Sequence, residues 1–288
     1  MRIGVTFPQN EITADPVAVR DYAQAAEGLG YMHLLAYDHV VGADIANRPD
    51  WGDRYTHRSL FHEPFVLFGY LAGLTTRLEF VPGVIILPQR QTVLVAKQAA
   101  EVDVLTGGQF RLGIGVGWNT VEYEALNEDF RNRGKRSEEQ IAVLRALFTD
   151  DVVTYHGTWH HIEAAGLNPM PVQRPIPIWI GGSSDATLKR VAKMGDGWFP
   201  QMPPGENARQ MLAQLHDYAR AEGRDPGAIG IEARVSIGGK NPDDWAREVE
   251  GWRTLGATHL AVNTMKAGLN SSQEHIDAIR RFAEAVGV

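Results

Sequence analysis

The chain has 288 residues, no cysteine, 28 basic and 35 acidic side chains, and a formal net charge of −7. The absence of cysteine excludes disulfide frameworks, thiolate metal sites and cysteine nucleophiles. The negative balance argues against a general nucleic-acid binder, which needs an excess of cations to neutralise phosphates. No apolar run approaches the roughly 20 residues of a membrane span and no signal peptide is visible, so we expect a cytoplasmic protein.

Short β-branched or aromatic runs alternate with amphipathic patterns along the whole chain. The eight predicted strands are 2–7, 32–37, 78–87, 110–116, 176–180, 197–200, 229–235 and 259–262. Predicted helices follow at about 16–29, 64–74, 92–105, 135–148, 184–194 and 208–221, with two more starting near residues 242 and 271. This alternation, without a linker, predicts an α/β fold with one domain over 1–288, a single (β/α)8 TIM barrel rather than a doubly wound sheet.

Helix boundaries carry recognisable signals. Asp15 before Pro16 combines an N-cap with a first-turn proline, and Gly30 ends that helix. Asn241 repeats this start before a proline, while Ser271 and Glu274 have the spacing of a capping box.

Two connections are too long for ordinary barrel loops: 42–62 after the second strand and 149–175 before the fifth. We expect both insertions to form the wall and lid of an active site, because long ordered loops in barrel enzymes do so. The first contains Trp51, Tyr55 and Phe61. It also contains three arginines, which either meet an anionic cofactor tail or substrate or are solvated: Arg48, Arg54 and Arg58.

The carboxyl ends of barrel strands form the active site, so the candidate residues can be read from the strand ends. They lie at 7–9, 38–39, 83–84 with 87, 115–119, 181–184, 198–200, 234 and 263–264. Glycines and aromatic residues outnumber acids there, which suits a flat ring better than a metal ion. We therefore predict no metal site.

Two of these strand ends suggest specific chemistry. The segment 180–187 passes from strand to helix through two glycines, and its freed amides with the Ser184 and Thr187 hydroxyls suit a phosphate, although an ordinary N-cap turn has the same pattern. His39 after Asp38 is placed to exchange a proton with a ring-bound substrate; a hydrogen-bonded strand end is the alternative.

Other motifs are weaker. The glycines of 113–117 lack the third spaced glycine of a dinucleotide-binding fingerprint, and no GxSxG elbow indicates a serine hydrolase. The basic stretch 131–136 is interpreted as a solvated helix start. The loop histidines fit no common zinc or iron spacing, and we expect them to be solvated: His57, His62, His156, His160 and His161.

Seven segments together match a known pattern: 3–9, 38–40, 62–65, 83–90, 96–100, 113–118 and 175–182. With them the chain resembles the bacterial-luciferase-like flavin and deazaflavin oxidoreductases, in particular their actinobacterial coenzyme F420-dependent branch. The resemblance implies a barrel with a larger insertion before the fifth strand. It implies that Gly83-Val84 is the third-strand bulge, where many members hold a non-prolyl cis peptide behind the cofactor ring.

The resemblance also implies roles for the strand-end residues. Asp38 and His39 match the pair near the ring, with His39 as catalytic proton partner and Asp38 as the residue that orients it. The expected cofactor-binding residues are Phe7, Asp38, Gly83, Val84, Gly115, Gly117, Trp118, Gly181, Gly182, Ser183, Ser184 and Thr187.

The implied function is an F420-dependent oxidoreductase that transfers a hydride between C5 of the deazaflavin and a small organic substrate. An FMN-dependent monooxygenase, in which reduced flavin activates oxygen, is the first alternative, and a flavin-binding barrel without turnover is the second. Where some family dehydrogenases carry an acid after the fourth strand, this chain has Trp118 or Asn119, which speaks against a sugar-phosphate dehydrogenase. We expect a homodimer through the apolar helices 64–74 and 92–105, and a flavin or F420 reductase as a partner.

Overall fold

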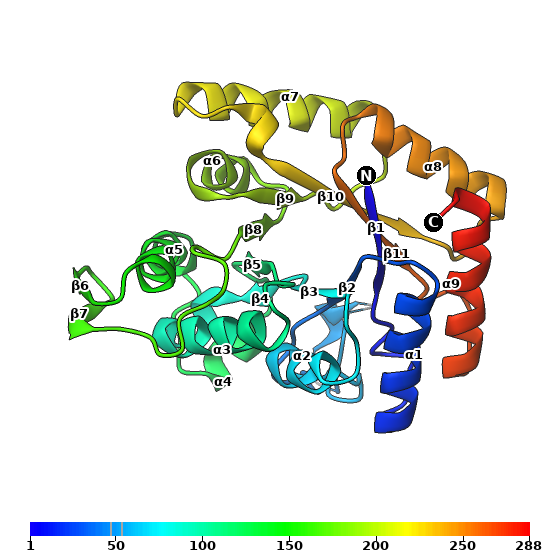
Figure 1. Ribbon diagram of the computed structural model, residues 1–288, viewed down its shortest axis with the longest axis horizontal. Coiled ribbons are helices and arrows are strands. Elements are labelled where there is room, and N and C mark those ends of the chain that lie inside the picture. The colour runs from blue at the N-terminus through cyan, green and yellow to red at the C-terminus, as the bar shows by residue number, and fades with distance from the viewer. Residues whose placement is uncertain (47, 53) are drawn as a thin grey trace.

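The main sheet consists of parallel strands that follow one another around a barrel (Figure 1). The structure is a computed structural model and describes residues 1–46, 48–52 and 54–288. Its sheet has the order β3-β2-β1-β11-β10-β9-β8-β5-β4. The strands are β1 (Arg2–Thr6), β2 (His33–Ala36), β3 (Glu79–Pro82), β4 (Ile85–Ile86), β5 (Leu112–Gly115), β8 (Ile178–Gly181), β9 (Gly197–Phe199), β10 (Gly230–Ser236) and β11 (His259–Asn263).

Helices cover the outside of this sheet. They are α1 (Pro16–Gly28), α2 (Pro64–Ala72), α3 (Thr92–Leu105), α4 (Thr120–Ala125), α5 (Arg133–Thr149), α6 (Asp185–Met194), α7 (Glu206–Ala221), α8 (Pro242–Thr254) and α9 (Ser272–Val286). Short 3-10 turns occupy Pro49–Trp51, Leu87–Gln89 and Pro226–Ala228. Among the described helices, none is both long and apolar enough to cross a membrane.

The third predicted strand, 78–87, is not continuous. Gly83 and Val84 divide it into β3, which pairs with β2, and β4, which pairs with β5. The two ends of the strand order are therefore consecutive pieces of chain, and the sheet closes on itself. The predicted (β/α)8 barrel is confirmed; the short helix α4, which the sequence patterns did not indicate, is an addition to it.

The structure confirms the predicted caps at Asp15 and Asn241 in full and the one at Ser271 in part. Asp15 accepts a hydrogen bond from Val17 N, and Asn241 forms a complete capping box with Asp244. The box predicted for Ser271 forms only in half: its side chain accepts from Glu274 N, but the Glu274 carboxylate accepts from Asn270 N instead of the cap residue.

Buried charges fill the amino-terminal end of the barrel. His33 Nε2 and Arg111 Nη1 each lie 2.8 Å from a different oxygen of Glu232, and Arg111 Nε lies 2.9 Å from Glu79 Oε2. Together with His259 these residues form what we term the basal charge cluster. Burial opposes ionisation of Glu232, but His33 and Arg111 outweigh it and lower the Glu232 pKa to about 2.

Candidate active site

The carboxyl ends of the strands surround a cavity of about 380 Å³, within the range of small-molecule sites. We term it the mouth cavity. Most of the predicted site residues line it together: Asp38, His39, Gly83, Val84, Gly115, Gly117, Trp118, Gly181, Gly182, Ser183, Ser184 and Thr187.

Phe7 is the exception among the predicted cofactor-binding residues. Its side chain is fully buried in the hydrophobic core and packs edge-on against Tyr22 and His62. It does not line the mouth cavity, because β1 ends at Thr6 and the next side chain turns toward α1. The assignment of Phe7 to the cofactor site is therefore wrong.

The floor of the mouth cavity is the bulge between β3 and β4. The Gly83–Val84 peptide bond is cis, as the resemblance implied. The Val84 side chain lies between Gly115 and Gly181, where an added Cβ would approach its methyl groups to 2.6 and 2.9 Å. These two glycines thus make room for Val84, which presents an apolar surface to the cavity.

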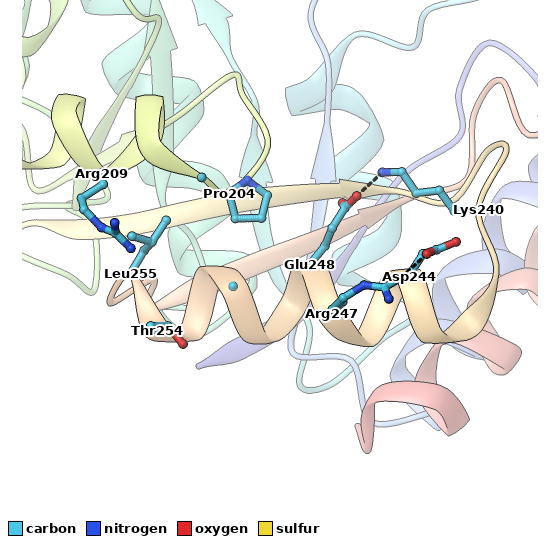
Figure 2. A pocket seen from close by; sticks show the side chains of 10 residues that line it. Pro204, Arg209, Lys240, Asp244, Arg247, Glu248, Thr254 and Leu255 are labelled. Carbon is cyan, nitrogen blue, oxygen red and sulfur yellow. Dashed lines mark hydrogen bonds and ion pairs between the residues drawn. The ribbon is translucent and has the colours of Figure 1, made fainter.

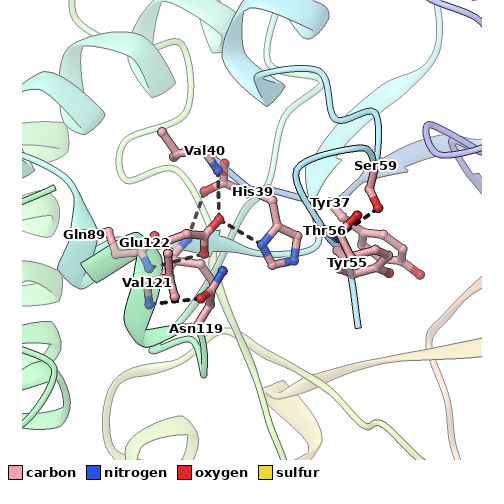
Figure 3. A network of polar contacts seen from close by, with 12 residues as sticks. Tyr37, His39, Val40, Tyr55, Thr56, Ser59, Gln89, Asn119, Val121 and Glu122 are labelled. Atoms are coloured by element: carbon pink, nitrogen blue, oxygen red, sulfur yellow. Dashed lines mark hydrogen bonds and ion pairs between the residues drawn. The ribbon is translucent and has the colours of Figure 1, made fainter. Parts of the chain in front are cut away.

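His39 stands above this floor in a fixed orientation. Its Nδ1 lies 3.0 Å from Glu122 Oε1, and the same oxygen accepts from Val40 N (Figure 3). Glu122 is buried on α4, a helix that begins at the side-chain cap Asn119. Because a carboxylate only accepts hydrogen bonds, the neutral imidazole carries its hydrogen on Nδ1 and leaves Nε2 free to take a proton.

Asp38 makes different contacts from those expected. Its carboxylate is paired with Arg90 at 2.7 Å and accepts from Ile86 N, and Arg90 also contacts Glu63 at 2.9 Å. Burial raises the pKa of Asp38, and the Arg90 charge acts in the opposite direction. Asp38 therefore ties β2 to the segment after the bulge, and the residue that orients His39 is Glu122.

The first long insertion forms an aromatic wall beside His39. The rings of Tyr55 and Phe61 lie 5.0 and 4.7 Å from the imidazole, and Trp118 lies at 6.0 Å. Trp51 packs against Trp118, and Arg54 lies over the same indole. The predicted wall is confirmed for this insertion, in which Asn47 and Asp53 lie outside the described residues.

The second insertion lies elsewhere. It forms a hairpin of β6 (Val153–His156) and β7 (His161–Ala165), which projects beside α5 at the edge of the molecule (Figure 1). Its residues do not line the mouth cavity, so the predicted lid role is wrong. It follows a helix and precedes a strand, which places its base at the amino-terminal end of the barrel.

The hairpin histidines are not all solvated. His160 is enclosed, with Nδ1 2.8 Å from Glu139 Oε1 and Nε2 2.6 Å from Thr92 Oγ1. His156 and His161 are exposed and stacked, and with Glu163 they place three potential ligand atoms within 4.8 Å of one another. The hydrogen bond from His156 to Glu163 accounts for this grouping.

The turn from β8 into α6 is an N-cap that borders the mouth cavity, and its binding of a phosphate stays a prediction. Ser184 caps the helix by accepting from Thr187 N, and its hydroxyl lies 2.8 Å from the Thr187 hydroxyl. Gly182 has φ +125°, a conformation that side chains rarely adopt. The turn exposes these hydroxyls to the mouth cavity while remaining an ordinary N-cap.

A larger groove of about 620 Å³ lies outside the barrel, between the start of α7 and α8 (Figure 2). Its charged groups pair with near neighbours: Lys240 with Glu248, Arg247 with Asp244, and Arg209 with Glu206. Because these charges are paired with each other, they are not left free for a ligand. The carboxyl ends of the strands, where barrel enzymes have their sites, surround the mouth cavity and not this groove. We therefore place the site at the mouth cavity.

Several mouth residues were not given a role from the sequence. They are Tyr37, Tyr55, Gln201 and Arg234, together with Glu122 behind His39. The signal for Arg234 was present, since it occupies a strand end, whereas Glu122 lies on a six-residue helix without a recognisable pattern. The basic stretch 131–136 begins α5, and its Arg136 is paired with Glu128 rather than solvated.

The family model for luciferase-like monooxygenase matches residues 1–281. The chain belongs to this family. An uncharacterized protein of Mycobacterium tuberculosis is 38% identical over 275 residues, which cover 92% of each chain. An FMNH2-dependent dimethylsulfone monooxygenase of Pseudomonas putida is 29% identical over 80% of this luciferase-like chain and 60% of its own length.

The fold of this luciferase-like protein is similar to solved structures over its whole length. An F420-dependent secondary alcohol dehydrogenase, in complex with an F420-acetone adduct, aligns with a TM-score of 0.80 at 16% identity, covering 99% of this chain and 98% of that one. Family membership identifies the chain as an oxidoreductase of the luciferase-like type.

Proposed function

We propose that the protein is an F420-dependent oxidoreductase that acts on a small organic substrate. The observation that carries this proposal is the mouth cavity itself, in which an apolar floor at Val84 faces an oriented histidine, His39. A fold neighbour that binds F420 supports the choice of cofactor.

The residues present fit a ring cofactor with a phosphate. Val84, seated between Gly115 and Gly181, offers a flat apolar surface for the ring. The amides and hydroxyls at Ser183, Ser184 and Thr187 stand at the start of α6, where the helix dipole favours an anion. We assign the ring to the bulge and the phosphate to this turn.

When bound, the deazaflavin would supply two-electron hydride chemistry at C5. The chain supplies the accompanying proton movement. His39 Nε2 takes the proton from a substrate hydroxyl in one direction and returns it in the other, while Glu122 holds Nδ1 and stabilises the charged imidazole. The aromatic wall of Tyr55, Phe61 and Trp118 limits the access of water to this group.

An FMN-dependent monooxygenase is the second candidate function. The 29% identity to an enzyme that uses FMNH2 favours it. The same floor and turn would accept this smaller cofactor, and a partner reductase would then supply it in reduced form.

We also propose that the protein acts in the cytoplasm as a homodimer. The support for a dimer is the apolar surface of two adjacent helices, where Val66 and Tyr70 on α2 and Val93 and Leu94 on α3 are exposed. Light scattering of the purified protein tests this: a monomer mass at micromolar concentration would contradict it.

Equilibrium titration with F420 and with FMN, each oxidised and reduced, tests the proposed function. Cofactor fluorescence and quenching of Trp118 report binding. We expect micromolar affinity for F420 and none for FMN; tight binding of FMN alone would favour the second candidate. The variant Thr187→Val should weaken cofactor binding about tenfold through loss of one hydrogen bond, whereas Thr254→Val in the outer groove should not change it.

A further inference from the structure

A second cavity of about 550 Å³ adjoins the mouth cavity. The two cavities share three lining residues, Tyr37, Tyr55 and Arg234. The second cavity extends away from the Ser184 turn, toward the ends of β1, β10 and β11. It is therefore the side on which a substrate would meet a cofactor bound over Val84.

Positive charge predominates in this second cavity. Among the described residues, Arg54, Arg234 and Lys266 line it, against one carboxylate, that of Glu11. That carboxylate already accepts a hydrogen bond from Lys266 N at 2.7 Å. The remaining lining is neutral and polar, including Asn10, Ser236 and Asn263.

Arg234 is exposed at the rim of the cavity, whereas Arg90 is half-buried and Arg111 and Arg190 are buried. Arg90, Arg111 and Arg190 each contact at least one carboxylate. Among the described residues no carboxylate pairs with Arg234, whose Nη1 donates only to the Tyr37 hydroxyl at 2.9 Å. A guanidinium forms planar paired hydrogen bonds with carboxylates, and most of its donors remain available here.

From this arrangement we propose that the second cavity binds the carboxylate of a small organic acid, with Arg234 as its main anchor and Lys266 and Arg54 nearby. Because Arg234 also borders the mouth cavity, an acid held there extends its other end toward His39 and the aromatic wall. Asn10, which also lines the cavity, has a buried Oδ1 without a hydrogen-bond partner among the described residues. This inference rests on the proposed function, of which it names the substrate class.

Small carboxylic acids and their uncharged amides, compared in pairs, test the proposed carboxylate site. Acetate, butyrate and benzoate are titrated against the protein beside their uncharged amides, by calorimetry, both without cofactor and after loading with the cofactor that binds. We expect each carboxylate to bind at least about tenfold more tightly than its amide, with a preference that weakens as NaCl rises. Equal binding of acid and amide would overturn the proposal.

Variants assign the preference to Arg234. Arg234→Met should abolish it, Arg234→Lys should retain part of it, and Arg209→Met in the outer groove should leave it unchanged. Thermal unfolding of each variant identifies any that fails to fold, and the Lys variant then decides. If Arg234→Met retains the preference, or weakens the cofactor while leaving the preference intact, the assignment is wrong.

The two proposals fail separately. Wild-type protein that binds neither F420 nor FMN contradicts the proposed function, while the ratio of acid to amide affinity in the cofactor-free protein still decides the anion site. Cofactor binding without any preference for acids overturns only the substrate class.

Discussion

The two ends of the barrel differ in how their charged groups are paired. At the amino-terminal end, the basal charge cluster pairs each cation with carboxylates in a closed interior. At the mouth, Arg234 contacts a tyrosine and open space. Strand β10 supplies a residue to each end: Glu232 to the basal charge cluster and Arg234 to the mouth. The two are two residues apart and therefore face the same side of the sheet. One strand thus carries a buried, paired carboxylate at one end of the barrel and, at the other, an exposed arginine with no carboxylate partner among the described residues.

The largest expected effect is at the mouth. His39→Ala should lower kcat about 10²–10⁴-fold, because it removes the group that exchanges a proton with substrate. Stability and cofactor affinity should change little, since the His39 side chain is not part of the core. Steady-state kinetics with every accepted substrate checks this, with His161→Ala on the exposed hairpin as the control. Unchanged turnover would refute the assigned role.

The basal charge cluster should show the reverse pattern. Glu232→Gln removes the carboxylate shared by His33 and Arg111 and should reduce the free energy of unfolding by about 3 kcal/mol, as when a buried pair loses one partner. Urea unfolding measures this loss. Glu250→Gln, which breaks an exposed pair with Arg253, should cost less than about 1 kcal/mol. If both variants lost the same free energy of unfolding, the buried cluster would stabilise the fold no more than an exposed ion pair does.

Low pH should destabilise the protein through the same basal charge cluster. The folded-state pKa of Glu232 is about 2, below its ordinary 4.5, so its contribution of about 3 kcal/mol is complete above pH 4.5 and is lost as pH falls toward 2. Burial and Arg111 lower the pKa of His259 to about 3, so the unfolded state binds more protons from pH 6.5 down to 3 and stability falls there too.

Unfolding in urea at a series of pH values from 7 to 3 checks this decline. In Glu232→Gln the decline below pH 4.5 should become shallower, because only the Glu232 share is lost, while the decline due to His259 between pH 6.5 and 3 remains. A stability that is constant below pH 6.5 would contradict the assignment of acid sensitivity to the basal charge cluster.

A smaller effect is expected from Glu122→Gln, which keeps the shape of the side chain but removes the charge opposite His39 Nδ1. Glu122 is a positioning residue, so kcat should fall about tenfold while KM and cofactor affinity stay within about twofold. Glu122→Asp should restore part of kcat. A change in KM alone would indicate a substrate contact instead.

Local sequence patterns were sufficient to predict the barrel fold and the end of the barrel at which the cavity lies. Asp15, Asn241 and the alternating strands act over a few residues, and the strand-end rule collects distant glycines at one end without coordinates. The cis peptide at Gly83–Val84 followed from the resemblance alone.

Long-range pairing was beyond sequence reasoning. His39 meets Glu122 across 83 positions, and Arg111 meets Glu232 across 121, with no periodicity to connect them. Asp38 was expected to orient His39 because it is adjacent in sequence, yet its carboxylate pairs with Arg90 and His39 pairs with Glu122 instead. Phe7 follows the end of β1, and its ring packs against Tyr22 and His62 in the core.

The tip of the hairpin β6–β7 is attached to the barrel mainly by the Glu139 side chain, beside the contact of His160 with Thr92. Glu139 accepts hydrogen bonds from the backbone of Thr158, Trp159 and His160 and from the His160 ring. The hairpin makes no contribution to the mouth cavity, and its outward side chains His156, His161 and Glu163 are exposed, while Val153 packs into the core. A fluorophore or affinity tag attached at one of these exposed positions would therefore report on or immobilise the enzyme at a distance from its proposed site.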